Sequence, residues 1–198
     1  NSPIIDDELT VTRFDGTDGR PVAVFVNWTA HPTFSGPQTM TVTADWPGYL
    51  QREIEGFLPG ATCLYSNGAE GDISTAGAQG PSEFARMEDY GRKLAVKVLG
   101  LIKDVETSGN PVFDYSMTTL NLPDRVVPAA LKDAAGPEYG LTPENLPALL
   151  DALSPPTSYL GVLRVGDLVA VSIPGEMASS LGLEIKTALR DAGAKSPI

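Results

Sequence analysis

The chain contains few of the residues on which several common protein chemistries depend. Among its 198 residues there is one histidine, His31, and one cysteine, Cys63. A lone cysteine excludes an intrachain disulfide, and the apolar segment around Cys63 predicts a buried side chain. A lone histidine excludes the H-E-x-x-H motif of metalloproteases. The chain also has no G-x-S-x-G nucleophile elbow, no P-loop and no complete dinucleotide fingerprint.

Basic residues and long apolar runs are also scarce. The chain has 14 Lys and Arg against 25 Asp and Glu, a formal net charge of −11. Nucleic acids and anionic lipid surfaces require a basic footprint, so neither is an expected partner. No apolar run reaches the roughly 18–20 residues that cross a bilayer, and we expect no transmembrane segment. The first residues contain no secretory signal peptide.

The patterns that are present predict an α/β fold in a single domain. Apolar residues recur at strand or helical spacing between turns that are rich in Gly, Pro and Asp. Predicted strands cover residues 10–14, 22–26, 61–65, 112–122, 160–165 and 168–173. Predicted helices cover residues 45–58, 82–105 and 176–189, with a short helix near 143–153 inside an irregular segment, 123–158. We expect a mixed sheet with hairpins and strand–helix units, and helices packed on the sheet.

Three polar loops follow predicted strands, where catalytic and metal-binding groups are commonly placed. The first contains His31, whose imidazole can bind zinc or act as a general base. The second, residues 66–75, combines close glycines with the polar side chains of Asn67, Glu70, Asp72 and Ser74. The third contains Glu176, a carboxylate between a strand and a helix, which can ligate a metal.

Each loop also has an ordinary structural interpretation. A lone histidine is more often a hydrogen-bonding residue than a ligand. A loop of Gly, Asp and Ser is usually a connection. A glutamate after Pro-Gly commonly begins a helix, where it interacts favourably with the helix dipole. Taken singly, none of the three loops specifies a function.

Taken together and in order, the segments resemble the neutral/alkaline non-lysosomal ceramidase family. Asn27-Trp-Thr-Ala-His31-Pro-Thr is similar to that family's strand ending in a zinc histidine. Thr43-Ala-Asp-Trp-Pro-Gly-Tyr49 is similar to the segment that opens its next helix. Asn67-Gly-Ala-Glu-Gly-Asp-Ile-Ser74 resembles its Gly-Asp-Val-Ser-Pro loop, and Pro174-Gly-Glu176 its Pro-Gly-Glu zinc ligand. The resemblance spans residues 8–190.

The resemblance implies a zinc-dependent amidase that hydrolyses ceramide, or a related N-acyl lipid, into fatty acid and sphingoid base. His31 and Glu176 would be zinc ligands, and Ser74 a catalytic residue, as nucleophile or as hydrogen-bond donor. Zinc lowers the pKa of a bound water and polarises the amide carbonyl. The loop residues Asn67, Gly71 and Asp72 would support this site. Secretion, or a periplasmic or cell-surface location, is also implied by the family.

The sequence departs from the family's pattern at several positions. The family takes a further zinc histidine from an earlier segment and a zinc tyrosine after Pro-Gly-Glu, and this chain matches neither. Thr75 stands where the family usually has proline. We therefore expect residues 1–198 to be a partial ceramidase-like catalytic domain that needs missing parts of the same domain or a complementary chain. With two of four protein ligands, it should bind zinc weakly.

Two alternatives remain open at this point. One is a metal-independent serine hydrolase that uses Ser74 and His31, which activity after exhaustive chelation would favour. The other is an incomplete, non-catalytic fragment that needs further chain segments. Absence of turnover with metal and a broad panel of N-acyl lipids would favour that fragment.

Overall fold

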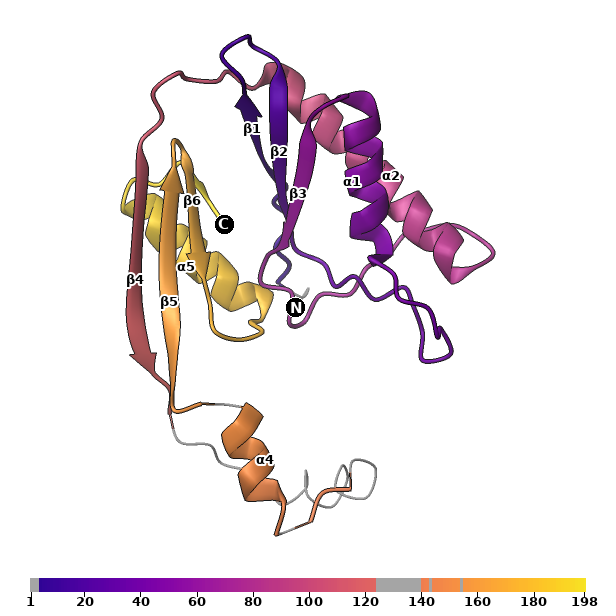
Figure 1. Cartoon of the computed structure of the whole chain (residues 1–198), viewed down its shortest axis with the longest axis vertical. Coiled ribbons are helices and arrows are strands. Elements are labelled where there is room, and N and C mark those ends of the chain that lie inside the picture. The colour runs from indigo at the N-terminus through magenta and orange to yellow at the C-terminus, as the bar shows by residue number, and fades with distance from the viewer. Residues whose placement is uncertain (1–3, 124–139, 143, 154) are drawn as a thin grey trace.

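The computed structural model describes residues 4–123, 140–142, 144–153 and 155–198, and it confirms the α/β class (Figure 1). The strands are β1 (Thr10–Asp15), β2 (Pro21–Trp28), β3 (Thr62–Asn67), β4 (Phe113–Asn121), β5 (Thr157–Val165), β6 (Leu168–Ser172) and β7 (Ser196–Pro197). The helices are α1 (Asp45–Phe57), α2 (Glu83–Leu101), a 3-10 turn η1 (Ile102–Asp104), α4 (Leu146–Leu153) and α5 (Ser179–Asp191). Of the irregular segment expected over 123–158, residues 124–139, 143 and 154 lie outside the described residues.

The strands form two sheets, and each of them is mixed. The first has the order β1-β2-β3, with β1 antiparallel to β2 and β2 parallel to β3. The second has the order β4-β5-β6-β7, antiparallel except for the β6–β7 pair. The two predicted hairpins are β1–β2 and β5–β6. Strand β7 was not predicted, because two residues are too few to show a period.

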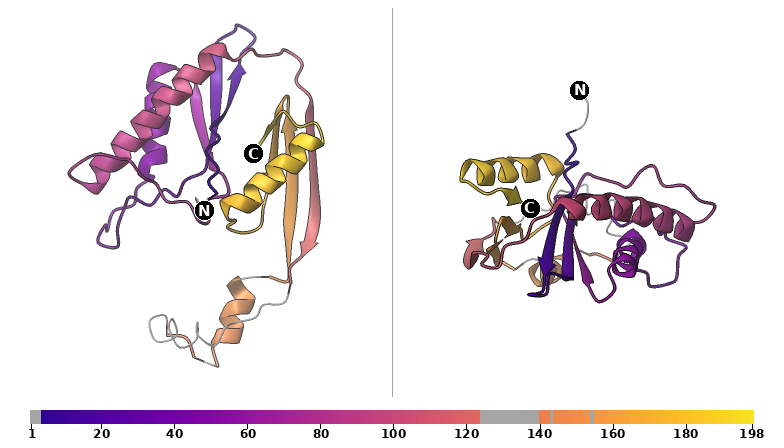
Figure 2. Two further views of the ribbon diagram at one scale, coloured as in Figure 1. Left: turned by 180° about the vertical axis from the view of Figure 1, so that it is seen from behind. Right: turned by 90° about the horizontal axis from the view of Figure 1, so that it is seen from above.

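Helices pack on both sheets, as the apolar periodicity predicts. Helices α1 and α2 lie together beside the first sheet, and α5 lies along the second (Figures 1 and 2). The largest buried cluster fills the space between the first sheet and the α1–α2 pair. Its buried side chains come from β2, α1, β3 and α2, and include Val24, Val26, Trp46, Leu50, Ile54, Cys63, Met87, Leu94 and Val98. The burial of Cys63 is therefore confirmed.

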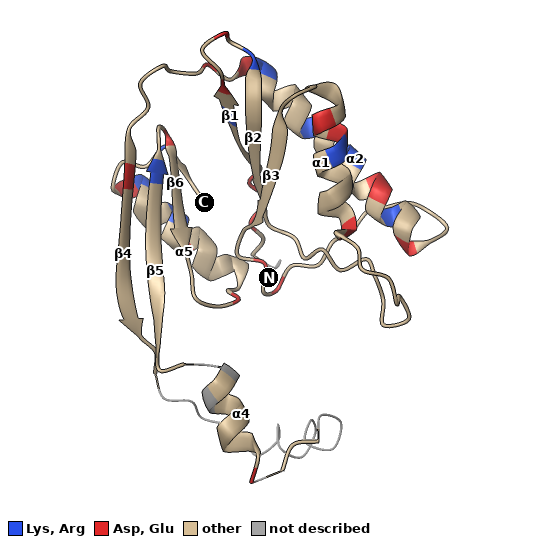
Figure 3. Ribbon diagram, in the orientation of Figure 1, with Lys and Arg blue, Asp and Glu red and all other residues tan. Residues whose placement is uncertain are grey.

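Charged residues concentrate on α1 and α2 and are sparse on the second sheet (Figure 3). Arg92 of α2 bonds Glu53 of α1 at 2.7 Å, so the two helices are also linked across their exposed surface. Strands β4 and β5 carry one charged residue each, Asp114 and Arg164. Within the described part of the chain, no helix is both long and apolar enough to span a bilayer.

A buried ion pair joins the segment before β1 to the last helix. Lys186 on α5 donates to Asp6 at 2.7 Å, and both side chains are almost fully buried. Asp6 also accepts a hydrogen bond from Thr29, just after β2, and Lys186 lies 3.4 Å from Glu8. A buried ion pair is tolerated when its remaining hydrogen-bonding capacity is satisfied in this way. The pair therefore fastens α5 to the end of β2.

Helix α1 begins at Asp45, as the sequence predicts, whereas the start of α5 differs from the prediction. Asp45 has a φ of 50°. Its carboxylate accepts the backbone N–H groups of Phe34 and Ser35 at 3.0 and 3.2 Å, so it fixes the preceding loop. Helix α5 begins at Ser179 and not at Glu176. The N–H of Ser179, the first residue of α5, donates to the side chain of Asp72 in the loop after β3. Glu176 therefore lies in the connection before the helix.

Parallel pairing of β2 with β3 determines where the polar loops lie. Carboxyl ends of parallel strands meet at one edge of a sheet, so the loops after Trp28 and Asn67 are neighbours. These are the loops that contain His31 and residues 66–75. The third loop, after β6, reaches the same edge from the second sheet (Figure 1).

A close approach of α1 to α2 at Gly91 provides a test of the packing. A Cβ at Gly91 would lie 2.6 Å from the Trp46 carbonyl oxygen, whereas one at Gly100 on the same helix would meet nothing within 4 Å. We predict that Gly91→Ala lowers the free energy of unfolding by about 1–3 kcal/mol. Gly100→Ala should raise it by about 0.5 kcal/mol. Urea unfolding followed by tryptophan fluorescence measures both, and effects of the same sign would contradict the packing.

Candidate functional site

The three polar loops meet, and main-chain hydrogen bonds hold them together. The N–H of His31 donates to the carbonyl of Ile73 at 3.1 Å, which joins the first loop to the second. The N–H of Gly71 donates to the carbonyl of Met177 at 2.8 Å, which joins the second loop to the third. Residues that are far apart in the sequence are thereby placed around one position.

Both ring nitrogens of His31 are engaged. Nδ1 lies 2.9 Å from the Ile73 carbonyl oxygen, and because a carbonyl only accepts, Nδ1 carries a hydrogen and donates it. Nε2 lies 2.6 Å from Oε1 of Glu176, a residue 145 positions away in the sequence. The Ile73 carbonyl raises the pKa of His31 above its usual value, burial opposes it in part, and Glu176 raises it further. These hydrogen bonds shift the protonation equilibrium of the ring toward the imidazolium form.

Glu176 is positioned by the contacts of its neighbours. Oδ1 of Asp72 accepts the N–H of Ser179, the first residue of α5, at 2.8 Å, and this bond holds the pKa of Asp72 below its usual value. A Cβ at Gly71 would lie 3.0 Å from the backbone of Met177, so a side chain there would push the two loops apart. Gly71 and Asp72, predicted from the sequence as supporting residues, therefore hold the connection that carries Glu176.

The backbone of His31 rests on an aromatic cluster. Trp46 is fully buried, and its Nε1 donates to the carbonyl of His31 at 3.3 Å. Tyr65 and Tyr90 pack edge-on against the Trp46 ring, with centroids 4.9 and 5.1 Å away. Rigid aromatic packing of this kind fixes the position from which the imidazole projects.

Asn67 and Glu70 form a second polar group in the loop after β3. Nδ2 of Asn67 donates to Oε1 of Glu70 at 2.6 Å. Asn67 was predicted as a supporting residue. Glu70 was noted only as one polar residue of the loop, because its position beside His31 and Glu176 depends on the loop conformation.

Ser74 follows Ile73, the residue that bonds His31 twice, and its side chain is exposed. Among the described residues, the Ser74 hydroxyl has no hydrogen-bond partner. The structure therefore brings Ser74 to the loop beside His31 but gives it no bond to His31 or Glu176. Its catalytic role stays a prediction.

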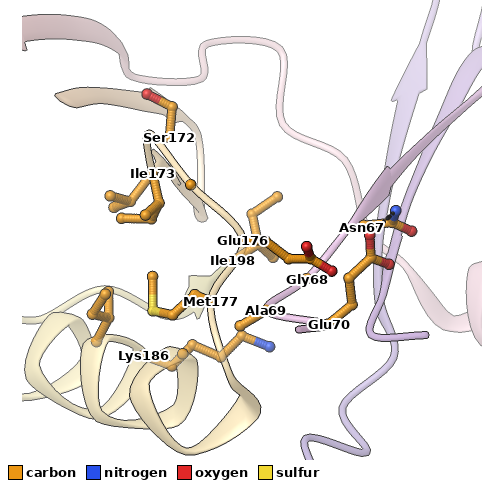
Figure 4. Close-up of a pocket in the computed structure, with 14 residues that line it drawn as sticks. Asn67, Gly68, Ala69, Glu70, Ser172, Ile173, Glu176, Met177, Lys186 and Ile198 are labelled. Atoms are coloured by element: carbon orange, nitrogen blue, oxygen red, sulfur yellow. Dashed lines mark hydrogen bonds between the residues drawn. The ribbon is translucent and has the colours of Figure 1, made fainter. Parts of the chain in front are cut away.

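A cleft of about 670 Å³ opens beside Glu176 (Figure 4). Its walls come from the loop after β3, the end of β6, the connection to α5, and α5 itself. Apolar side chains alternate there with a few polar ones. The lining residues include Asn67, Glu70, Ile173, Glu176, Met177, Ile185, Lys186 and Ile198.

The donor types beside the cleft are those of part of a zinc site. Zinc in proteins is commonly bound by imidazole nitrogen and carboxylate oxygen. His31 and Glu176 present one of each, 2.6 Å apart. Over the described ranges, no group of three or more His, Cys, Asp or Glu side chains is arranged to hold a metal ion. The chain thus offers two converging donors.

The single histidine allows a direct measurement of this geometry. We predict that an NMR titration gives His31 a pKa above its usual value of about 6.5, and that Glu176→Gln lowers it. Because the folded pKa is raised, protonation of His31 stabilises the fold below the unfolded pKa. This stabilisation is lost as the pH rises through the folded pKa. A His31 pKa below 6.5 would contradict the two hydrogen bonds.

Comparison with known proteins places the fold. No protein-family model matches the sequence, and no curated protein matches it. Among solved structures, the chain is similar to neutral ceramidase from Pseudomonas aeruginosa, with a TM-score of 0.74, and to a ceramidase complexed with C2, with a TM-score of 0.70. Identity is 16% in both cases, and both alignments cover 98% of this chain.

The chain spans 39% and 40% of the length of these two ceramidases. At this identity the likeness shows the fold and not the activity. The resemblance stated from the sequence is therefore confirmed for the architecture: the chain has the fold of a part of ceramidase structures.

Proposed function

We propose that this chain forms part of a zinc-dependent amidohydrolase domain, which cleaves the amide bond of ceramide or a related N-acyl lipid into fatty acid and sphingoid base. The observation that carries the proposal is the approach of His31 Nε2 to Glu176 Oε1, 2.6 Å apart, beside a cleft that Glu176 lines. The fold shared with ceramidases supports the same function.

In this proposal His31 and Glu176 hold the metal. When bound, zinc supplies a Lewis acid that polarises the amide carbonyl and activates a water molecule. The Ile73 carbonyl fixes the imidazole through Nδ1, which directs Nε2 into the site, and such orientation of a ligand raises metal affinity. Gly71 and Asp72 hold Glu176 in place. Ser74 would donate a hydrogen bond to the water or to the developing oxyanion.

The walls of the cleft suit a lipid substrate. Ile173, Met177 and Ile185 give an apolar lining next to Glu176. An acyl or sphingoid chain gains free energy by burying methylene groups against such a surface, about 0.8 kcal/mol for each. Methionine adapts to chains of different shape. An apolar cleft for a lipid chain therefore agrees with amide hydrolysis at a zinc ion held by His31 and Glu176.

The geometry of His31 disfavours the metal-independent alternative. A serine nucleophile needs a base within hydrogen-bond reach, with a free lone pair. Here Nδ1 faces Ile73 and Nε2 faces Glu176, so neither nitrogen is directed to Ser74. The third alternative, a fragment that needs further segments for activity, is compatible with the proposal because the chain spans two fifths of the ceramidases of similar fold.

The first test is the metal requirement of the full-length protein that carries this chain. We predict that exhaustive chelation abolishes hydrolysis of N-acyl sphingoid lipids and that zinc restores it. Glu176→Gln should lower kcat by more than about 100-fold, because even residues that only orient a ligand cost about 10–100-fold. Glu184→Gln, an exposed residue of α5, is the matched control. Activity that survives chelation but is lost in Ser74→Ala would instead support the serine hydrolase.

The second test concerns the 198-residue chain alone. With two protein donors, we predict weak zinc binding, which His31→Ala or Glu176→Gln removes. Equilibrium dialysis with metal analysis measures the stoichiometry and affinity. A tight site with one zinc per chain would show that other residues complete the coordination.

A further inference from the structure

One carboxylate oxygen of Glu70 has no hydrogen-bond partner in the part of the chain that the structure describes. Oε1 accepts the hydrogen bond from Asn67, but Oε2 is buried from solvent and no donor among the described residues reaches it. A buried acceptor without a partner costs free energy, so native structures keep few of them. An acceptor of this kind that lines a cleft is suited to a donor on a ligand.

The loop holds this carboxylate in a defined orientation. The Tyr65 hydroxyl has one hydrogen and lies within bonding distance of two acceptors, the Trp28 carbonyl oxygen at 2.9 Å and Oδ1 of Asn67. Because a carboxylate only accepts, the Asn67 amide directs its NH₂ group to Glu70. The arrangement extends from β2 through β3 to the loop, so Oε2 is fixed relative to the core.

The charged groups around Glu70 do not stabilise its carboxylate in this position. Burial raises the pKa of Glu70, and the neighbouring Glu176 adds to this, while His31 opposes it. Lys186 lines the same cleft, but its ammonium group bonds Asp6 at 2.7 Å. Glu70 is thus a carboxylate that is partly desolvated beside another carboxylate and has no ion pair of its own among the described residues.

We propose that Glu70 is a specificity-determining residue, whose Oε2 accepts the amide hydrogen of the bound N-acyl substrate. This inference rests on the proposed function and deepens it, because it explains how the site would recognise an amide in preference to an ester. The residue would contact the substrate directly, without taking part in metal binding.

The geometry of a secondary amide supports this role. In a trans amide the carbonyl oxygen and the N–H point in opposite directions. If the carbonyl faces His31 and Glu176, the N–H faces away from them. Glu70 extends toward Glu176 from the loop after β3, whereas Glu176 comes from the connection after β6 (Figure 4). An amide hydrogen directed at the loop after β3 would meet the Glu70 carboxylate.

An ester lacks this hydrogen and presents an oxygen instead. Its lone pairs would face Oε2, which leaves the buried acceptor unpaired and adds repulsion. Sites built to bond a substrate N–H discriminate strongly against analogues without it, because the polar group of the site is then unsatisfied. Oε2 of Glu70 would therefore favour amide over ester substrates.

The test compares a matched pair of substrates in the full-length protein: an N-acyl sphingoid lipid and its analogue with oxygen in place of the amide N–H. Glu70→Gln should lower kcat/KM for the amide by about 100-fold and raise it for the ester, since the variant presents a donor, which the ester oxygen can accept and the amide N–H cannot. Glu70→Asp, which keeps the carboxylate, should restore part of the preference for the amide. Glu184→Gln removes the same charge from an exposed position and should affect neither substrate.

A stability measurement separates this role from a structural one. In the 198-residue chain, Glu70→Gln removes a partly buried charge beside Glu176, and the melting temperature should rise by about 2–4 °C. A residue kept for structure would lower it.

Each outcome decides between the two proposals. Equal losses for amide and ester, an unchanged amide rate, or a lower melting temperature in Glu70→Gln would overturn the role of Glu70 while the proposed function stands. A wild-type protein that hydrolyses neither substrate would overturn the proposed function, and the role of Glu70 with it.

Discussion

The candidate site depends on the docking of the loop after β3 against the start of α5. Three hydrogen bonds make this contact, from Gly71 N–H to the Met177 carbonyl, from Ser179 N–H to Asp72, and from the Ser179 hydroxyl to the Ala69 carbonyl. His31 belongs to the first sheet and Glu176 to the segment after the second. These bonds, together with the Lys186–Asp6 pair, bring the imidazole and the carboxylate to 2.6 Å from each other. Small residues are needed at the contact, which explains a glycine at position 71.

The rest of the fold makes this docking possible. Parallel pairing of β2 with β3 brings the loops that follow them to one edge of the sheet. The buried Trp46 fixes the backbone of His31 through a hydrogen bond to its carbonyl. Lys186 and Asp6 fasten α5 to the end of β2. The site is therefore assembled on elements and not on the loops alone.

Periodicity alone predicted most strands and helices, because burial repeats with the period of each element. It did not predict β7, which is too short to show a period. It also placed the start of α5 at Glu176, because a local sequence pattern does not reveal the hydrogen bond that Ser179 N–H donates to Asp72. The prediction that the three loops form one site came from the family resemblance. The unpartnered oxygen of Glu70 could not be predicted, since it depends on how the loop places Asn67 beside Glu70.

The contacts that build the site join distant parts of the chain, and this has a consequence for folding kinetics. His31 and Glu176 are 145 residues apart, and Asp6 and Lys186 are 180. Closing such long loops is entropically costly, and proteins rich in distant contacts fold slowly. During synthesis, the strand that carries His31 leaves the ribosome long before its partner exists. The α1–α2 layer can form early, whereas the cleft can close only after α5 has been made.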